Sequence, residues 1–318
     1  MRLAVGCRLA VAVVLLGGAI AAASCASAEA GPVPAYRAEV APDAPRRFVL
    51  FGDSRRTLNE EFWRARYDRE RLAVIDALAG ERPAFIVNTG DLVSAGSDRA
   101  DWRRFHEENR PIFSLGIPYF PGLGNHEYMW NRDEGLANYF ASFPGLRGRK
   151  WYELRFPPVL VLVLDSNLGE LDDAEVSAQD RWLSEALAAA EKDDAIRHVI
   201  LTCHHAPFTN SVVHGDSRDV QEHFLSRRTP KVHVAFTGHV HAYERFLVDG
   251  VQCVVSGGGG APLTPVDVEK PRHKDLFRAP AYRGFHYARF TVDGTRLACD
   301  ILMLKNGAWS RVDGFECR

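Results

Sequence analysis

Short, mostly apolar runs recur along the chain and alternate with longer polar segments. The runs that predict strands cover residues 48–51, 85–87, 117–120, 198–201 and 232–236. Apolar residues follow one another in these runs without a period of two, which is typical of parallel strands buried on both faces. The amphipathic segments that predict helices cover about 59–79, 98–114 and 177–191. In the first of them the expected apolar stripe is Phe62, Leu72, Ile75 and Leu78.

The later part of the chain is richer in strand-like runs. Residues 151–156 and 159–164 flank a pair of prolines and predict a hairpin. The residues after about 284 predict closing hairpins, one of which turns at Asn306-Gly307. Because helices alternate with strands at first and strands dominate later, we expect an α/β (α+β) fold. Its form would be a four-layer αββα sandwich of two mixed β-sheets flanked by helices.

The N-terminus has the pattern of a targeting segment. Arg2 and Arg8 accompany an apolar run over 11–23, and Ala26-Ser27-Ala28 is a small-residue cleavage site. The apolar run has the length of a signal-peptide core and is short for a membrane span. We therefore expect a signal peptide over 1–28 and an exported protein, either periplasmic or extracellular.

A second interpretation of the same segment is a lipoprotein. The small residues at 22–24 precede Cys25, which would then carry the lipid and hold the protein at a membrane. In either case, four prolines over 29–46 predict an extended linker. The residues at 47–318 would then form the functional domain.

Composition limits the classes of partner. The 318 residues carry a formal net charge of -2, with 46% hydrophobic and 25% charged residues. These are the values of an ordinary globular protein, and no basic surface for a nucleic acid is indicated. Six cysteines are too few for a disulfide scaffold in a chain of this length. The sequence carries no sign of the oligomeric state.

Polar side chains with oxygen or nitrogen donors follow each of the predicted strands. In chain order they are Asp53, Asp91, Asn125, the pair His204-His205, and His239 with His241. The carboxyl ends of parallel strands meet at one edge of a sheet, where α/β proteins bind their ligands. A donor set of carboxylates, an amide and imidazoles without thiolates is typical of Mn, Fe or Zn sites. The pattern predicts a metal site at one rim of the sandwich.

The motifs around these residues resemble the calcineurin-like metallophosphoesterase family, and most closely its purple acid phosphatase-like bacterial members. The residues that carry the resemblance are Gly52-Asp53, Gly90-Asp91, Gly124-Asn125-His126-Glu127, His204-His205 and the run Gly238-His239-Val240-His241-Ala242-Tyr243-Glu244-Arg245. Further similar stretches are 139–144, 179–183 and 257–263. The resemblance implies a hydrolase with two divalent metal ions.

The resemblance also implies a role for each residue. Asp91 would bridge the two metals, and Asp53 and His241 would bind the first. The second metal would be bound by Asn125, His239 and one histidine of the pair. His204 is favoured by the residues Phe208-Thr209-Asn210 that follow it, whereas Pro207 favours His205. His126 would not bind metal but would face the scissile phosphate as a general acid or charge stabiliser.

Two positions depart from the family pattern. The segment Asp53-Ser54-Arg55 lacks the histidine of the wider family, and Ser94 stands where the purple branch has a tyrosine. An arginine cannot deprotonate to become a ligand. We therefore expect divalent Mn, Fe or Zn without a charge-transfer colour, and a first site that is weak or empty. Arg55 itself is predicted to hold the substrate phosphate by a two-pronged contact.

Together these residues predict an exported phosphoesterase acting on a small phosphate-ester substrate. Phosphomonoesters are the expected class, with diesters as an open alternative, and a hydroxide held between the metals would attack phosphorus. The competing hypothesis is a degenerate domain that binds metal or a phosphorylated ligand without turnover. It is prompted by the missing ligands of the first site.

Overall fold

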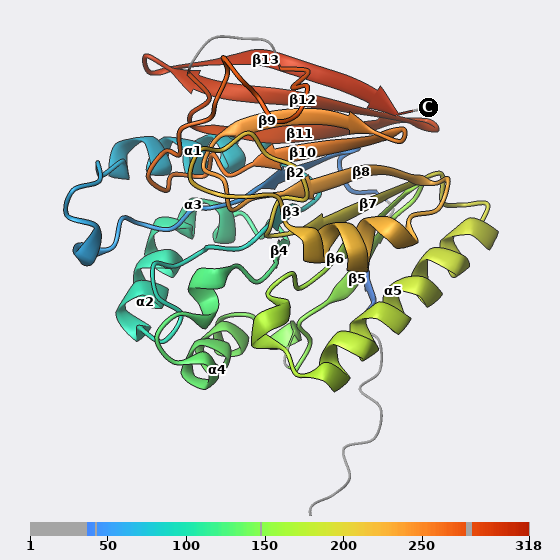
Figure 1. Cartoon of the computed structure of the whole chain (residues 1–318), viewed down its shortest axis with the longest axis horizontal. Helices are drawn as coiled ribbons and strands as arrows, with labels where there is room; N and C mark the ends of the chain where they lie inside the picture. Colours follow the sequence, from blue (N-terminus) through green and yellow to red (C-terminus); the bar gives the residue numbers. More distant parts are fainter. Residues whose placement is uncertain (1–36, 42, 147, 278–281, 318) are drawn as a thin grey trace, which may run out of the picture. The chain divides into compact units, whose positions relative to one another are not determined.

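Two β-sheets form the centre of the fold. The computed structural model describes residues 37–41, 43–146, 148–277 and 282–317. A seven-stranded sheet has the order β1-β5-β6-β7-β8-β10-β9, and a six-stranded sheet has the order β13-β12-β11-β2-β3-β4. Both sheets are mixed, as expected, because each combines parallel and antiparallel neighbours. Figure 1 shows the arrangement of these strands and the helices around them.

The strands are short in the parallel parts and longer in the closing hairpins. Those of the seven-stranded sheet are β1 (Arg37–Glu39), β5 (Tyr152–Phe156), β6 (Val159–Val163), β7 (His198–Cys203), β8 (Val232–Thr237), β9 (Tyr243–Val248) and β10 (Val251–Ser256). Those of the six-stranded sheet are β2 (Arg47–Phe51), β3 (Ile86–Asn88), β4 (Tyr119–Pro121), β11 (His286–Asp293), β12 (Arg296–Lys305) and β13 (Ala308–Cys317).

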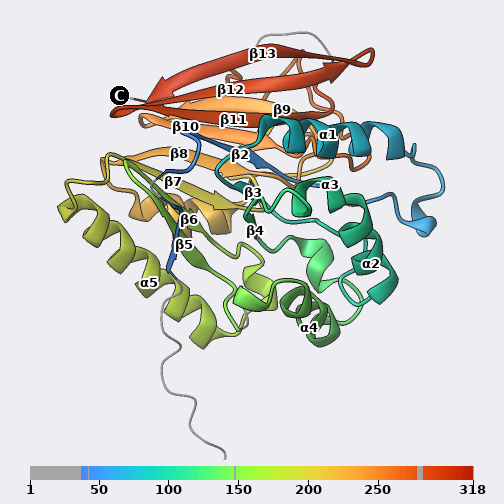
Figure 2. The same ribbon diagram turned by 180° about the vertical axis from the view of Figure 1, so that it is seen from behind.

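The α-helices among the described residues pack around the two sheets. They are α1 (Asp68–Glu81), α2 (Arg99–Glu108), α3 (Arg110–Phe113), α4 (Arg132–Ser142) and α5 (Asp173–Lys192). An apolar cluster joins α5 to the outer face of β6, β7 and β8, and another joins α1 to the outer face of β2 and β11. Figure 2 shows α1 and α5 from behind. No helix among the described residues is long and apolar enough to cross a membrane.

The main core lies between the sheets. Residues of β2 alternate between two environments: Phe48 and Leu50 face this core, whereas Val49 and Phe51 belong to the cluster under α1. Phe48 meets Phe156 of the other sheet edge to face, with ring centroids 5.9 Å apart. Burial on both faces explains why these strands read as continuous apolar runs. The predicted four-layer sandwich of two mixed sheets is confirmed.

Several expected boundaries differ from the structure. The helix predicted over 59–79 begins only at Asp68, after one short 3-10 turn at Asn59–Glu61. Its stripe was half wrong, because Phe62 is 84% exposed and Leu72 is 42% exposed. Phe62 lies before the helix begins, and Leu72 lies on its solvent-exposed side.

Two further differences lie elsewhere in the chain. Helix α5 begins four residues earlier than predicted, because Asp172 and Glu175 form a capping box at its start. The expected linker over 29–46 contains β1, which pairs in parallel with β5. The rest of that linker up to residue 36, and the expected signal peptide with Cys25, lie outside the described residues. The turn predicted at Asn306-Gly307 is present, and both residues have positive φ.

Candidate metal centre

The candidate donors come from the carboxyl ends of strands in both sheets. Strands β2, β3 and β4 are parallel and lead to Asp53, Asp91 and Asn125. Strands β7 and β8 of the other sheet are also parallel and lead to His204 and His239. The oxygen donors therefore lie on one sheet and the imidazoles on the other. This split explains how residues almost two hundred positions apart meet at one rim.

The backbone is unusual at three of these positions. Asp53, Asp91 and His239 have φ of 61°, 56° and 67°, in the left-handed region that residues other than glycine rarely adopt. Such conformations cost on the order of 1–3 kcal/mol each and cluster at functional sites. The three residues lie in the turns that follow β2, β3 and β8.

Glycines next to the donors create room for the carboxylates. A Cβ added at Gly124 would lie 2.3 Å from Asp91 Oδ1, and one added at Gly238 would lie 2.4 Å from Asp53 Oδ2. Both distances are far below contact, so no larger residue fits at either position. The glycines before Asn125 and His239 in the sequence motifs thus have a steric cause.

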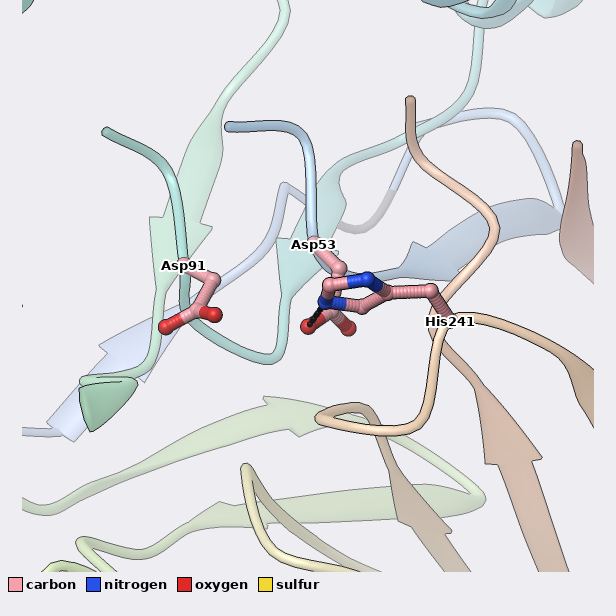
Figure 3. A group of neighbouring side chains, drawn as sticks. All are labelled: Asp53, Asp91 and His241. Carbon is pink, nitrogen blue, oxygen red and sulfur yellow. Dashed lines mark ion pairs between the residues drawn. The ribbon is translucent and has the colours of Figure 1, made fainter. Parts of the chain in front are cut away.

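The first half of the centre consists of Asp53, Asp91 and His241 (Figure 3). Each offers one donor atom, and these atoms all lie within 4.8 Å of one another. His241 Nε2 is 3.3 Å from Asp53 Oδ1. His241 Nδ1 lies 2.6 Å from the carbonyl oxygen of Pro262, which can only accept, so the ring proton sits on Nδ1. The lone pair of Nε2 therefore points at the carboxylates, as a metal ligand requires.

The second half consists of Asn125, His204 and His239, with Asp91 beside them. His204 Nε2 lies 3.0 Å from Asn125 Oδ1 and 3.4 Å from Asp91 Oδ1. His239 Nδ1 lies 3.2 Å from both Asn125 Oδ1 and His204 Nε2. The carbonyl of Thr89 accepts from His204 Nδ1 at 3.2 Å and fixes its tautomer. Three donor atoms thus lie within 3.2 Å of one another, with Asp91 Oδ1 next to His204 Nε2, a set of donors that fits a divalent cation.

The choice between the two neighbouring histidines follows from this geometry. His204 is fully buried and its Nε2 faces the donors, whereas His205 Nδ1 pairs with the hydroxyl of Ser166 at 2.9 Å. The ring of His205 nevertheless lies only 4.5 Å from that of His239. The geometry favours His204 as the ligand, and its role as a ligand stays a prediction.

Asp91 lies between the two halves and is held ionised. Burial raises the pKa of its carboxyl group, but His204, His126 and Arg55 together lower that pKa well below its ordinary value. Its Oδ1 also accepts the backbone N–H of His126 at 3.0 Å. A buried, permanently ionised carboxylate that faces both donor groups is suited to bridge two cations.

His126 lies beside Asp91 and outside both donor groups. Its Nδ1 is 2.6 Å from the carbonyl of Ser94, and its Nε2 is 3.8 Å from Asp91 Oδ2. Burial first, and then the charge of Arg55, lower its pKa although Asp91 raises it. The ring is therefore oriented by Ser94 and presents Nε2 to the space next to the shared carboxylate.

The sequence profile of the calcineurin-like phosphoesterases matches residues 47–243, which contain every candidate donor. The chain belongs to the calcineurin-like phosphoesterase family. Its relatives include plant phosphatases and purple acid phosphatases. The resemblance inferred from the sequence motifs is thereby confirmed at the level of the family.

Individual relatives of this calcineurin-like phosphoesterase are distant. Phosphoenolpyruvate phosphatase of Allium cepa is 25% identical over 249 residues, which cover 71% of this chain and 47% of that protein. A protein named probable inactive purple acid phosphatase 9, of Arabidopsis thaliana, is 24% identical over 273 residues, 70% of this chain and 42% of that protein. The chain thus spans less than half the length of these two relatives. A solved dimetal phosphatase of Danio rerio shares the fold, with a TM-score of 0.56 at 17% identity over 86% of this chain and 99% of that one.

Arg55 is the position at which this phosphoesterase differs from the sequence expectation. Its Nη1 and Nη2 lie 2.9 and 3.2 Å from the two carboxylate oxygens of Glu61. The two terminal nitrogens expected to bind phosphate therefore already bind a carboxylate. This ion pair would have to break before the guanidinium could make a bidentate contact with phosphate. Only Nε faces the centre, 3.7 Å from Asp91 Oδ2.

Two glutamates outside the predicted donor set, Glu127 and Glu61, support the centre. The carboxylate of Glu127 accepts backbone N–H groups of Gly124, Asp91 and Leu92 at 2.7, 2.8 and 2.8 Å, so it ties two donor loops together. Glu127 is hydrogen-bonded to the backbone of Asp91 itself, so it supports Asp91 more directly than it supports His126. Glu61 was missed entirely, because a charged residue in a polar loop carries no sequence signal for such a contact.

Proposed function

We propose that this chain hydrolyses phosphate esters at a centre of two divalent metal ions. The observation that carries the proposal is the convergence of Asn125 Oδ1, His204 Nε2 and His239 Nδ1 within 3.2 Å of one another beside Asp91. Nothing in the packing of a stable core calls for these three atoms to face each other. Hydrogen bonds among them leave Asn125 Oδ1 and His204 Nε2 as two acceptors 3.0 Å apart, because the ring proton of His204 is engaged with Thr89.

The donor set fits Mn, Fe or Zn, with Asp53, Asp91 and His241 in the first site and Asp91, Asn125, His204 and His239 in the second. When bound, such ions polarise the ester and lower the pKa of a water molecule to near neutrality. Asp91 holds the two donor groups at a fixed spacing. A phosphate group beside His126 would raise the pKa of its ring, so that Nε2 could donate a proton to the leaving oxygen.

The proposed substrates are small phosphomonoesters, with diesters as the open alternative. Support comes from the phosphatase relatives, one of which is named for phosphoenolpyruvate. Ser94 bonds the carbonyl of Arg56 and has no phenolate to offer a trivalent iron, which supports an all-divalent centre. We further propose export from the cytoplasm, supported by the targeting pattern of the first 28 residues.

A second candidate function is a binding domain without turnover. Arg55 beside Asp91 and the relative named as probably inactive both favour it. The intact second half and the orientation of His126 favour catalysis.

The decisive experiment is hydrolysis of an aryl phosphate by the full chain after chelator treatment and reloading with Mn²⁺, Zn²⁺ or Fe²⁺. We expect turnover with at least one ion, none with the chelated protein, and about a thousandfold less with His239→Ala. The exposed His106 supplies the matched control, and His106→Ala should keep full activity. Tight binding of inorganic phosphate without turnover under every metal would favour the second candidate instead.

A further inference from the structure

A permanently charged guanidinium is buried next to the carboxylate that both halves of the centre share. Arg55 is only 3% exposed, and its Nε lies 3.7 Å from Asp91 Oδ2. This Nε has no hydrogen-bond partner among the residues that the structure describes. A guanidinium stays charged at every accessible pH, so the first half always contains a fixed positive charge. That charge opposes a cation bound by Asp53, Asp91 and His241.

Glu61 is the residue that holds this charge in place. Its two oxygens take both terminal nitrogens of Arg55 in a fork-to-fork pair, at 2.9 and 3.2 Å. Its Oε2 also accepts the backbone N–H of Leu58 at 2.9 Å, which fixes the carboxylate within its own short turn. Burial raises the pKa of Glu61, but the bonds and charge of Arg55, with Leu58 and Arg64, lower it to about 2. The carboxylate is therefore ionised whenever the protein is folded near neutral pH.

The position of Glu61 is itself tied to the first half of the centre. Arg64 Nη1 lies 2.9 Å from Glu61 Oε1, and Arg64 Nη2 donates to the carbonyl of Pro262 at 2.8 Å. The same carbonyl accepts from His241 Nδ1 at 2.6 Å. An unbroken path of contacts thus leads from Asp91 through Arg55, Glu61 and Arg64 to Pro262 and His241. These segments are far apart in sequence, so this path is a product of the fold.

We propose that Glu61 is a positioning residue that sets the metal affinity of the first half by holding and neutralising Arg55. It turns the guanidinium away from the donor atoms and offsets its charge. Arg64 anchors Glu61 at the carbonyl that orients His241. This inference rests on the proposed metal centre and goes beyond it, because it assigns control of first-site occupancy to a residue that touches neither metal nor substrate.

The consequence of losing Glu61 follows from its contacts. Without Glu61, the guanidinium of Arg55 can turn toward Asp91. A bidentate ion pair there would compete with the cation for the same carboxylate oxygens. Even without that movement, its charge would no longer be offset. We expect the first-half dissociation constant to rise about tenfold or more, within the range of 10–100-fold known for residues that orient ligands. The second half has no contact with Arg55 except through Asp91 and should change about threefold at most.

The test is calorimetric titration of Mn²⁺ or Zn²⁺ into the chelator-treated full chain. The wild type should show two binding events, and His241→Ala, which removes a first-half donor, identifies the event that belongs to that half. Glu61→Gln should weaken this event about tenfold or more, Glu61→Asp should fall in between, and the neighbouring exposed Glu60→Gln should match the wild type. Circular dichroism of each metal-free variant checks that the fold is kept, and Glu61→Asp serves if Glu61→Gln does not fold.

A double-mutant cycle separates positioning from a merely structural role. Arg55→Met should tighten the first-half event, and adding Glu61→Gln to Arg55→Met should change it about threefold at most. An unchanged first-half constant in Glu61→Gln would overturn the inference, and so would the full weakening in the Arg55→Met background. If the wild type shows two binding events and Glu61→Gln leaves both dissociation constants unchanged, this inference alone is wrong. If the wild type shows neither event, the proposed function is wrong.

Discussion

The two halves of the candidate centre are built differently although they share Asp91. The second half places Asn125, His204 and His239 directly against one another, with no ion pair to an arginine or lysine recorded for these three among the described residues. The first half pairs Asp53 with His241 but has Arg55 next to Asp91. The comparison teaches that the two halves differ in their charge environment as well as in the ligands that the first half lacks relative to the family. Under the proposed function, metal affinity in the first half therefore depends also on how the charge of Arg55 is held.

The largest effect should come from breaking the second half. His239→Ala removes one of the donors of the second half, so turnover of an aryl phosphate should fall about thousandfold, the scale of losing one strong electrostatic contact at a reacting centre. Metal content by mass spectrometry should fall by one ion. If His239→Ala keeps both the ion and the activity, the assignment of the second half is wrong.

A smaller effect should follow in the first half. His241→Ala leaves Asp53 and Asp91 in place, so turnover should fall about 10–100-fold and recover in part with excess metal. Steady-state kinetics over a range of Mn²⁺ concentrations measures this recovery. Equal losses in His239→Ala and His241→Ala, with no recovery in either, would erase the proposed difference between the halves.

Glu127, which supports both halves, should affect the stability of the fold more than the rate of turnover. Glu127→Gln weakens an acceptor of three buried N–H groups and should lower the free energy of unfolding by about 2–3 kcal/mol. Urea denaturation of the metal-free protein measures the loss. Glu134→Gln, an exposed acid near the start of α4, is the control and should cost nothing measurable. An equally small change in both variants would contradict the role given to Glu127.

The smallest effect concerns pH. Because the folded-state pKa of Glu61 is lowered from 4.5 to about 2, despite a contribution from burial that raises it, its stabilising effect is complete above pH 4.5. It is lost as the pH falls toward 2. Each pKa unit corresponds to about 1.4 kcal/mol, and solvent screening of this partly exposed pair reduces the total. The difference in unfolding free energy between wild type and Glu61→Gln should therefore be about 2 kcal/mol at neutral pH and shrink steadily below pH 4.5. A difference that stays constant from pH 6 to 3 would show that Glu61 does not act as a charged group.

Much of the fold could be predicted because its strands are buried on both faces. A run such as Phe48 to Phe51 has to be apolar at every position when both sides face a core, so it stands out from any neighbouring segment. The candidate donors could be proposed for the same reason, since each follows such a run within a few residues. The start of α5 could also have been found, because Asp172 and Glu175 have the spacing of a capping box.

The loop between β2 and α1 could not be predicted in the same way. The predicted helix began too early because Phe62 has the spacing of an apolar stripe. In the structure the side chain of Phe62 is 84% exposed. The contact of Arg64 with Pro262 joins residues 198 positions apart, and no local pattern encodes it. The ion pair of Arg55 with Glu61 could therefore not be predicted from the sequence. For this reason the guanidinium was expected to bind phosphate, although in the structure it binds Glu61.

The division of donors between the two sheets has a thermodynamic consequence. Cations bound at this rim would join loops from both sheets, so part of their binding free energy would resist separation of the layers. Metal at about a hundred times its dissociation constant would add roughly 2.7 kcal/mol to the folded state. The ions would then hold the two sheets together along one edge of the sandwich. Removing them would lower the stability of the packing between the sheets as well as abolish the proposed hydrolysis.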